Sequence, residues 1–184
     1  MCSSDLTDVI ERLGGAIHPS QRLWLSAEAG TSRQPVFSPR NSWQADASAL
    51  VARRTSAGVE YRRWNYTPGP VDIVIPHVTT DAAGVTWDLR AFLSRNPSQR
   101  TDGAFTLRAT GGLSRRTTVS LLGGAGRESF LVGSVVRSLQ TVTGVAGLRY
   151  HAANGLTLRL DASAIHSRPV LSRSGVAIGV ERGF

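Results

Sequence analysis

Apolar and polar residues alternate with a period of two along most of this chain, in runs separated by turn residues. From Leu156 to Ala164 every even position is Leu or Ala, and the positions between them are Thr, Arg, Asp and Ser. Successive side chains of a β-strand point to opposite faces, so such a run predicts a strand with one apolar and one polar face. Because the pattern recurs, we predict an all-β protein.

Ten runs show this pattern, at residues 22–30, 42–54, 57–66, 71–80, 85–95, 103–112, 117–127, 139–151, 155–167 and 173–184. Most are close to the roughly 9 to 11 residues with which a tilted barrel strand crosses a bilayer. The alternation breaks from Arg62 to Trp64, which predicts a bulge, and Pro76 cannot donate a ladder hydrogen bond. Residues 7–17 fit an eleventh strand or a helix ended by Gly14 and Gly15, and we favour the strand.

Composition limits how the chain could meet a membrane or a nucleic acid. The 184 residues fit one domain or one medium-sized barrel, and no stretch approaches the roughly 20 apolar residues of a transmembrane helix. If the chain spans a membrane, it does so as strands. The net charge of +8 comes from arginine, because lysine is absent, and these arginines are scattered without a basic run. We therefore expect no nucleic-acid partner.

Connection lengths provide a second test of architecture. Tight connections lie near residues 152–154, 113–116, 81–84 and 55–56, and longer ones cover 168–172, 128–139, 96–102, 67–70 and 31–41. This interleaving is typical of bacterial membrane barrels, which have short periplasmic turns and longer external loops. The alternative is a soluble barrel of lipocalin type, which would carry its polar residues outside.

We therefore predict an antiparallel transmembrane β-barrel in the outer membrane of a Gram-negative bacterium, in contact with outer-membrane lipids. Ten or eleven strands are visible, and because single-chain bacterial barrels have even numbers, an odd count means that at least one N-terminal strand is missing. Residues 1–6 resemble a translated sequencing-adapter end. We expect the barrel domain to be residues 7–184, truncated at its N-terminus, with a signal peptide and any preceding module missing.

The last run ends on an aromatic residue. One face of this run carries Val176, Ile178, Val180 and Phe184. A terminal aromatic after alternating apolar residues resembles the signal by which the outer-membrane assembly machinery recognises its clients. Arg182 departs from that pattern, where an apolar residue is usual.

Several short motifs, taken in order, resemble the YaiO-type family of outer-membrane β-barrels. They are Trp24-Leu25-Ser26, Pro35-Val36-Phe37, Trp43-Gln44-Ala45-Asp46, the segment Gly58–Trp64 and the closing segment Gly175–Phe184. The resemblance covers about residues 7–184. It implies a barrel of about twelve strands and a link to polysaccharide export or the envelope surface.

On a barrel the polar faces line the lumen, and eight charged side chains are expected there: Arg62, Asp88, Arg90, Arg108, Arg149, Arg159, Asp161 and Glu181. Charges of mixed sign at close range tend to pair, because an isolated buried charge is costly. Two hypotheses follow. The one we favour is a structural ion-pair network, and the other is an arginine-lined path for an anionic solute.

The sequence predicts no catalytic residue, metal site or cofactor. The four histidines lack metal-ligand spacing. Barrels that cleave lipids place a Ser beside a His, so Ser163 or Ser167 with His151 is the alternative enzymatic hypothesis. The glycine-rich segment 123–127 lacks the Lys and Ser or Thr of a phosphate-binding loop, which favours a structural role. We predict a non-enzymatic barrel that assists passage of a solute or a surface polysaccharide.

Aromatic residues occur mainly toward the ends of the predicted strands, at Trp24, Trp43, Trp64, Tyr66, Trp87, Tyr150 and Phe184. This placement predicts the interfacial girdles of a membrane barrel, although tryptophans in a soluble β core would be similar. Trp24 falls on the polar face, against the girdle hypothesis.

Overall fold

Eleven strands follow one another in the described part of the chain. The computed structural model describes residues 9–33, 38–67, 69–96, 101–132, 135–152, 155–168 and 171–182, with only the backbone for 128, 130–137, 171 and 182. The strands are β1 (Val9–Ser20), β2 (Leu23–Arg33), β3 (Asn41–Ala52), β4 (Thr55–Tyr66), β5 (Gly69–Ala82), β6 (Val85–Arg95), β7 (Thr101–Ser114), β8 (Thr117–Val132), β9 (Val135–His151), β10 (Leu156–Arg168) and β11 (Leu171–Arg182).

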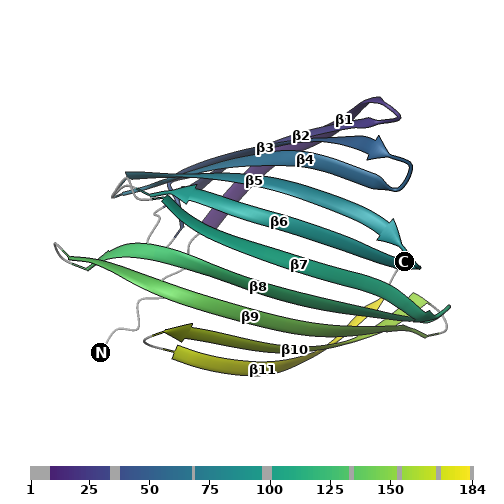
Figure 1. Cartoon of the computed structure of the whole chain (residues 1–184). Helices are drawn as coiled ribbons and strands as arrows, with labels where there is room; N and C mark the ends of the chain where they lie inside the picture. The colour runs from purple at the N-terminus through teal and green to yellow at the C-terminus, as the bar shows by residue number, and fades with distance from the viewer. Residues whose placement is uncertain are drawn as a thin grey trace.

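The strands form one antiparallel sheet in which each strand pairs with its neighbour in sequence (Figure 1). The sheet curls, so that it has an inner and an outer face, and β1 and β11 are not paired with each other in the described residues. The prediction of an all-β antiparallel sheet is therefore confirmed. Residues 9–20 form a strand, so the helical alternative for this segment is wrong. Within the described residues no helix is long and apolar enough to span a membrane.

We name the two ends of the sheet by their connections. The turn end carries the two-residue turns 21–22, 53–54, 83–84 and 115–116, and the loop end is the opposite one. At Ala83 and Gly84 φ is 52° and 76°, the pair of positive values that a type I′ hairpin turn requires. This turn suits the right-handed twist of β5 and β6.

The connection lengths differ from those predicted. Segments 67–70, 128–139 and 168–172 were expected to be long loops, but the strands extend into them and leave only residues 67–68, 133–134 and 169–170 between strands. At 128–139 the apolar residues on both sides of the turn continue the β8–β9 ladder as far as Val132 and Val135. Strict interleaving of short and long connections is therefore wrong, although the antiparallel course of the strands is unaffected.

The predicted bulge near Arg62 is absent. Tyr61 to Trp64 pair without interruption with Val74 to Val71. The register shifts instead near the turn end, between Leu50 and Ala52 among other places. The doubled arginines put Arg62 on the inner face and Arg63 on the outer face, so they interrupt the chemical pattern and not the ladder. Pairing of β5 with β6 does skip Ile75 and Pro76, as the missing donor of proline predicts.

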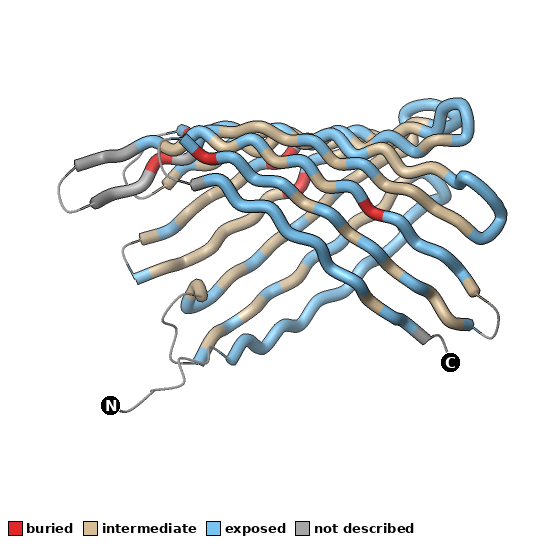
Figure 2. The backbone as a smooth tube through the Cα atoms, turned by 90° about the horizontal axis from the view of Figure 1, so that it is seen from below, coloured by how far each residue is buried: buried red, intermediate tan, exposed pale blue. Residues whose placement is uncertain are grey.

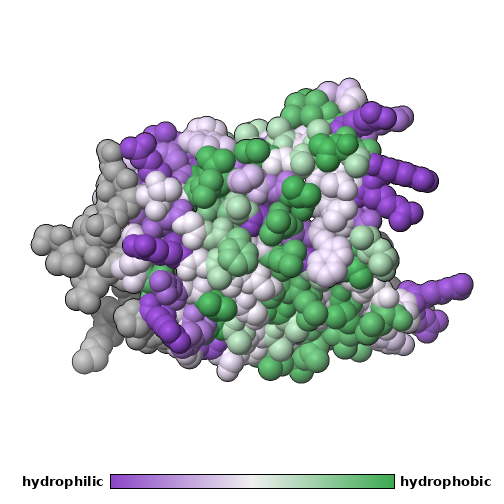
Figure 3. Space-filling view, in the orientation of Figure 1, coloured by the Kyte–Doolittle hydropathy of each residue, from purple (hydrophilic) through white to green (hydrophobic). Residues whose placement is uncertain are grey.

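The apolar faces of the strands point outward. Outer side chains in the middle of the sheet include Leu107, Leu121 and Leu160, with exposed fractions of 41%, 55% and 43%. Among the described apolar residues only Ile75 is fully buried, and Figure 2 shows few buried positions anywhere. The accessible surface is 13170 Å², whereas a compact soluble protein of this mass exposes about 8,600 Å². The face in Figure 3 carries an apolar band between two hydrophilic ends.

Candidate lumen surface

The register brings all eight predicted charged residues to the inner face. Asp88 lies directly opposite Arg108, and Arg149 lies directly opposite Arg159. Strand pairing is continuous from β3 to β11, so the face of each of the eight residues follows from its pairing partners. Directly opposed residues share a face, and alternate residues along a strand do so too. The period-two pattern therefore assigned these side chains to one surface, and the pairing decides which of them meet.

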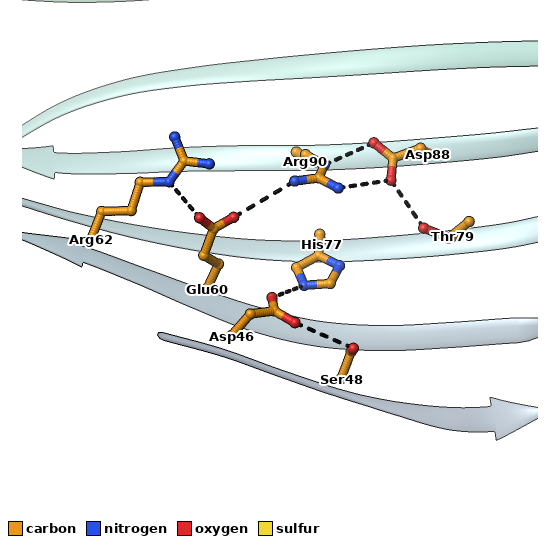
Figure 4. A network of polar contacts seen from close by, with 8 residues as sticks. All are labelled: Asp46, Ser48, Glu60, Arg62, His77, Thr79, Asp88 and Arg90. Carbon is orange, nitrogen blue, oxygen red and sulfur yellow. Dashed lines mark hydrogen bonds and ion pairs between the residues drawn. The ribbon is translucent and has the colours of Figure 1, made fainter. Parts of the chain in front are cut away.

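The wall formed by β3 to β6 carries a dense polar network (Figure 4). Glu60, only 7% exposed, lies between two arginines and forms an ion pair with each: one with Arg62 Nε, and one with Arg90 Nη1 at 3.7 Å from its Oε2. Arg90 Nε also donates to Asp88 Oδ1 at 2.9 Å, and Thr79 Oγ1 donates to Asp88 Oδ2 at 3.0 Å. Each charge in this chain of contacts has an opposite charge beside it.

A second part of the network lies on β3 and β5. His77 Nε2 is 2.8 Å from Asp46 Oδ2, and Ser48 Oγ donates to Asp46 Oδ1 at 3.3 Å. A Cβ at Gly58, between them, would lie 2.6 Å from Ser48 Cβ and 2.7 Å from His77 Nε2. Glycine at this position therefore lets the histidine approach the aspartate.

Asp46, Glu60 and His77 are not among the eight lumen charges that the sequence predicts. Asp46 and Glu60 are directly opposite each other on β3 and β4, and two opposed carboxylates require cations nearby. The alternating pattern could have indicated Asp46 and Glu60, since both occupy polar positions of alternating runs. Which arginine reaches them depends on the register of three strands, and no local pattern contains that information.

The opposite wall, from β7 to β10, is different. Arg108, Arg149, Arg159 and Asp161 line a hollow of about 390 Å³ on the inner face. Arg159 forms ion pairs with Asp161, through Nε, and with Glu181, at 3.9 Å. Arg108 and Arg149 form no ion pair within 4 Å with the residues that the structure describes. Three guanidinium groups thus share a hollow whose lining holds one carboxylate, Asp161, while Glu181 lies beside Arg159 and Asp88 lies opposite Arg108.

Like charges directly opposite each other destabilise a pair of strands. Arg149 has Arg159 on one side and Thr118 on the other, so no carboxylate lies on either neighbouring strand at its rung. An anion in the hollow would relieve this repulsion and could accept hydrogen bonds from more than one guanidinium group. The wall from β7 to β10 is therefore suited to an anion, whereas the wall from β3 to β6 is internally neutralised.

The described part of the predicted assembly signal lies on β11, and the glycine-rich segment lies on β8. Val176, Ile178 and Val180 lie on the outer face of β11 and are 71%, 81% and 64% exposed. Phe184 lies outside the described residues. The glycine-rich segment 123–127 is part of β8, where a Cβ at Gly126 would lie 2.4 Å from Ala104 Cβ.

Only some of the aromatic residues lie on the outer face, as the predicted girdles require. Trp43, Trp87 and Tyr150 are on the outer face with exposed fractions of 43%, 40% and 40%. Trp24 and Trp64 lie opposite Ser48 and Ser42 respectively, on the inner face. The girdle prediction is wrong for Trp64 because the unbroken ladder places it on the same face as Arg62.

The suggested Ser and His pairs do not come together. His151 Nδ1 contacts Thr157 Oγ1 at 3.0 Å, and Ser163 is six residues further along β10, about 20 Å away at the rise of a strand. Ser167 contacts Thr141 instead.

A different pair is close, His166 Nδ1 and Ser172 Oγ at 2.6 Å on the outer face. However, Arg168 Nε donates to His166 Nε2 at 3.4 Å, which leaves the imidazole proton on Nδ1. The imidazole then donates to Ser172 and cannot act as its base.

Comparison with known proteins supports the architecture. No family model matches this chain, and no curated protein is similar to it in sequence. Its structure is similar to that of the NanC porin, solved in a rhombohedral crystal form, with a TM-score of 0.54. The alignment covers 96% of this chain and 94% of that chain at 13% identity. This chain has a porin-like β-barrel fold. The likeness is one of fold, and at 13% identity no site residue is transferred by position.

Proposed function

We propose that this protein is a non-enzymatic outer-membrane barrel of a Gram-negative bacterium whose lumen passes anionic solutes. The observation that carries the proposal is the hollow lined by Arg108, Arg149 and Arg159, in which Arg108 and Arg149 form no ion pair within 4 Å with the described residues. Rings or tracks of arginine select anions in membrane pores. The likeness to a protein called a porin supports passage of a solute.

Both hypotheses from the sequence contribute to this proposal. The wall from β3 to β6 fits the structural ion-pair network, because Glu60 and Asp88 neutralise Arg62 and Arg90. The wall from β7 to β10 fits the arginine-lined path. A passing anion would meet one neutralised wall and one wall with excess positive charge, which favours entry without the tight binding that would stop conduction.

The test is the ion selectivity of the full chain in planar bilayers, from the reversal potential in a salt gradient. The wild type should favour anions, and an R108A/R149A variant should lose much of that preference. Replacement of the same two residues by Lys keeps the charge and should keep the selectivity. Absent conductance in the wild type, or an unchanged reversal potential in the Ala variant, would contradict the proposal.

Location can be tested separately. We expect the protein in the detergent-resistant envelope fraction, with a heat-modifiable band on a gel, and in contact with outer-membrane lipids. The outer face of Val176, Ile178 and Val180 supports recognition by the outer-membrane assembly machinery. A protein that stays soluble without detergent would exclude a membrane location.

A polysaccharide is a narrower candidate for the solute, and it rests on the resemblance to YaiO-type barrels. An acidic oligosaccharide offers carboxylates that guanidinium groups bind. The test is block of the conductance by such an oligosaccharide, compared with a neutral one of equal length. Equal block by both would remove the acidic polysaccharide from consideration.

A further inference from the structure

Five arginines near the loop end project from the outer face, away from the lumen. They are Arg33, Arg63, Arg95, Arg127 and Arg168, one on each of β2, β4, β6, β8 and β10. The register places them outside: Arg63 is opposite Trp43, Arg127 is opposite Gly103, and Arg168 is opposite Gln140. We call this set the outer arginine belt.

The belt carries more positive charge than the outer carboxylates near it can neutralise. Among the described residues, the strands place two carboxylates on the outer face near this end, Glu11 and Asp72. Glu11 is 2.7 Å from Arg33, and Asp72 is 3.5 Å from Arg63. Arg95 lies directly opposite Asp72, and the two remaining members, Arg127 and Arg168, have no carboxylate partner in the described residues.

Arg127 and Arg168 flank a neutral residue, whereas Arg63 and Arg95 flank Asp72. Both are exposed, and both lie directly opposite Gln140 of β9, which is between them. Arg127 Nε donates to Ser138 Oγ at 2.8 Å, and Arg168 Nε donates to His166 Nε2 at 3.4 Å. In both cases Nε holds the side chain in place. The Nη groups make no hydrogen bond with the described residues.

Apolar side chains adjoin the belt on the side of the sheet centre. Leu93 is two residues from Arg95, and Phe105 and Val142 lie on the rungs next to Arg127, with exposed fractions of 50%, 55% and 58%. At the turn end, by contrast, four arginines lie in the turns and not on the outer face of a strand: Arg53, Arg54, Arg115 and Arg116. An amphiphile with its chains on the apolar band would therefore have its head group at the level of the belt.

We propose that the outer arginine belt binds the phosphate groups of membrane lipids in the leaflet at the loop end, with the main site at Arg127, Gln140 and Arg168. This inference rests on the membrane location proposed above. Guanidinium forks match phosphate oxygens, and an amide between them adds a further donor. The adjoining apolar band selects a lipid over free phosphate, because it removes acyl chains from water.

The test measures lipid binding to the full chain in detergent by native mass spectrometry. Phosphatidic acid is the probe, phosphatidylcholine with the same chains is the neutral comparison, and inorganic phosphate is the competitor. The wild type should retain phosphatidic acid, and R127Q/R168Q should bind it about tenfold more weakly. The matched control R53Q/R116Q removes the same charge from the turn end and should bind like the wild type.

Three outcomes would overturn the proposal: equal binding by the wild type and R127Q/R168Q, equal weakening in the turn-end control, or full displacement by millimolar inorganic phosphate. A heat-modifiable band confirms that each variant is folded, and R168Q alone serves if the double variant does not fold. Conductance of the wild type is a separate readout. A barrel that binds the lipid without conducting would contradict only the pore, and one that conducts without binding would contradict only the belt.

Discussion

Arg149 lies directly opposite Arg159 on the inner face, and both line the same hollow with Arg108. Two neighbouring strands thus present like charges to each other where an opposed carboxylate would have been stabilising. Across the sheet, Glu60 instead lies between Arg62 and Arg90, and Glu60 and Asp88 together neutralise these two arginines. The distribution of charge along the inner wall is therefore uneven.

R149E should convert the repulsion between β9 and β10 into an attraction. We expect the anion preference of the pore to fall or reverse, with stability unchanged or raised by less than about 1 kcal/mol, because the side chain is exposed. Reversal potentials and urea unfolding in lipid vesicles measure the two effects. R149Q should give a smaller change in selectivity than R149E, and a larger one would contradict the electrostatic explanation.

E60Q should weaken the wall from β3 to β6. Glu60 is nearly buried, so loss of its charge leaves Arg62 and Arg90 with one fewer partner, and we expect a loss of about 1–3 kcal/mol of unfolding free energy. Anion selectivity should rise, since positive charge in the lumen is released. The control is E11Q on the outer face, whose exposed pair with Arg33 should contribute less than about 1 kcal/mol.

L160R tests whether the outer face contacts lipid. Leu160 is in the middle part of β10 and points outward, so an arginine there should reduce stability in vesicles by about 2–4 kcal/mol. S163R places the same side chain on the inner face of the same strand, where water can solvate it. Equal losses in the two variants would show that the outer face is not a lipid surface.

Quenching of tryptophan fluorescence by brominated lipids should separate the four tryptophans. Variants that retain only Trp43 or only Trp87 should be quenched, because both side chains are on the outer face. Variants that retain only Trp24 or only Trp64 should be protected, because the ladder places both on the inner face. Strong quenching of Trp64 would contradict the uninterrupted register of β3 with β4.

Much of the fold could be predicted without the structure, and some of it could not. The alternation from Leu156 to Ala164 identified a strand and its faces because side-chain direction in a strand depends only on position parity. Connection lengths were misjudged at 128–139, where the hairpin continues as paired strands. The bulge expected near Arg62 was wrong for a related reason. A break in polarity does not require a break in the ladder when a residue such as Arg63 finds Asp72 on the outer face.

The sequence by itself determined that this chain folds as antiparallel strands, and it determined which charged residues share a face, because both follow from a local period of two. Tertiary structure decided which of those charges meet. Glu60 reaches Arg90, which is 30 residues away, and Arg149 is placed against Arg159 and not against a carboxylate. That outcome depends on register, which is set by hydrogen bonds between strands and by the turns that join them. The arginine-rich hollow and the outer arginine belt exist only once every strand is paired.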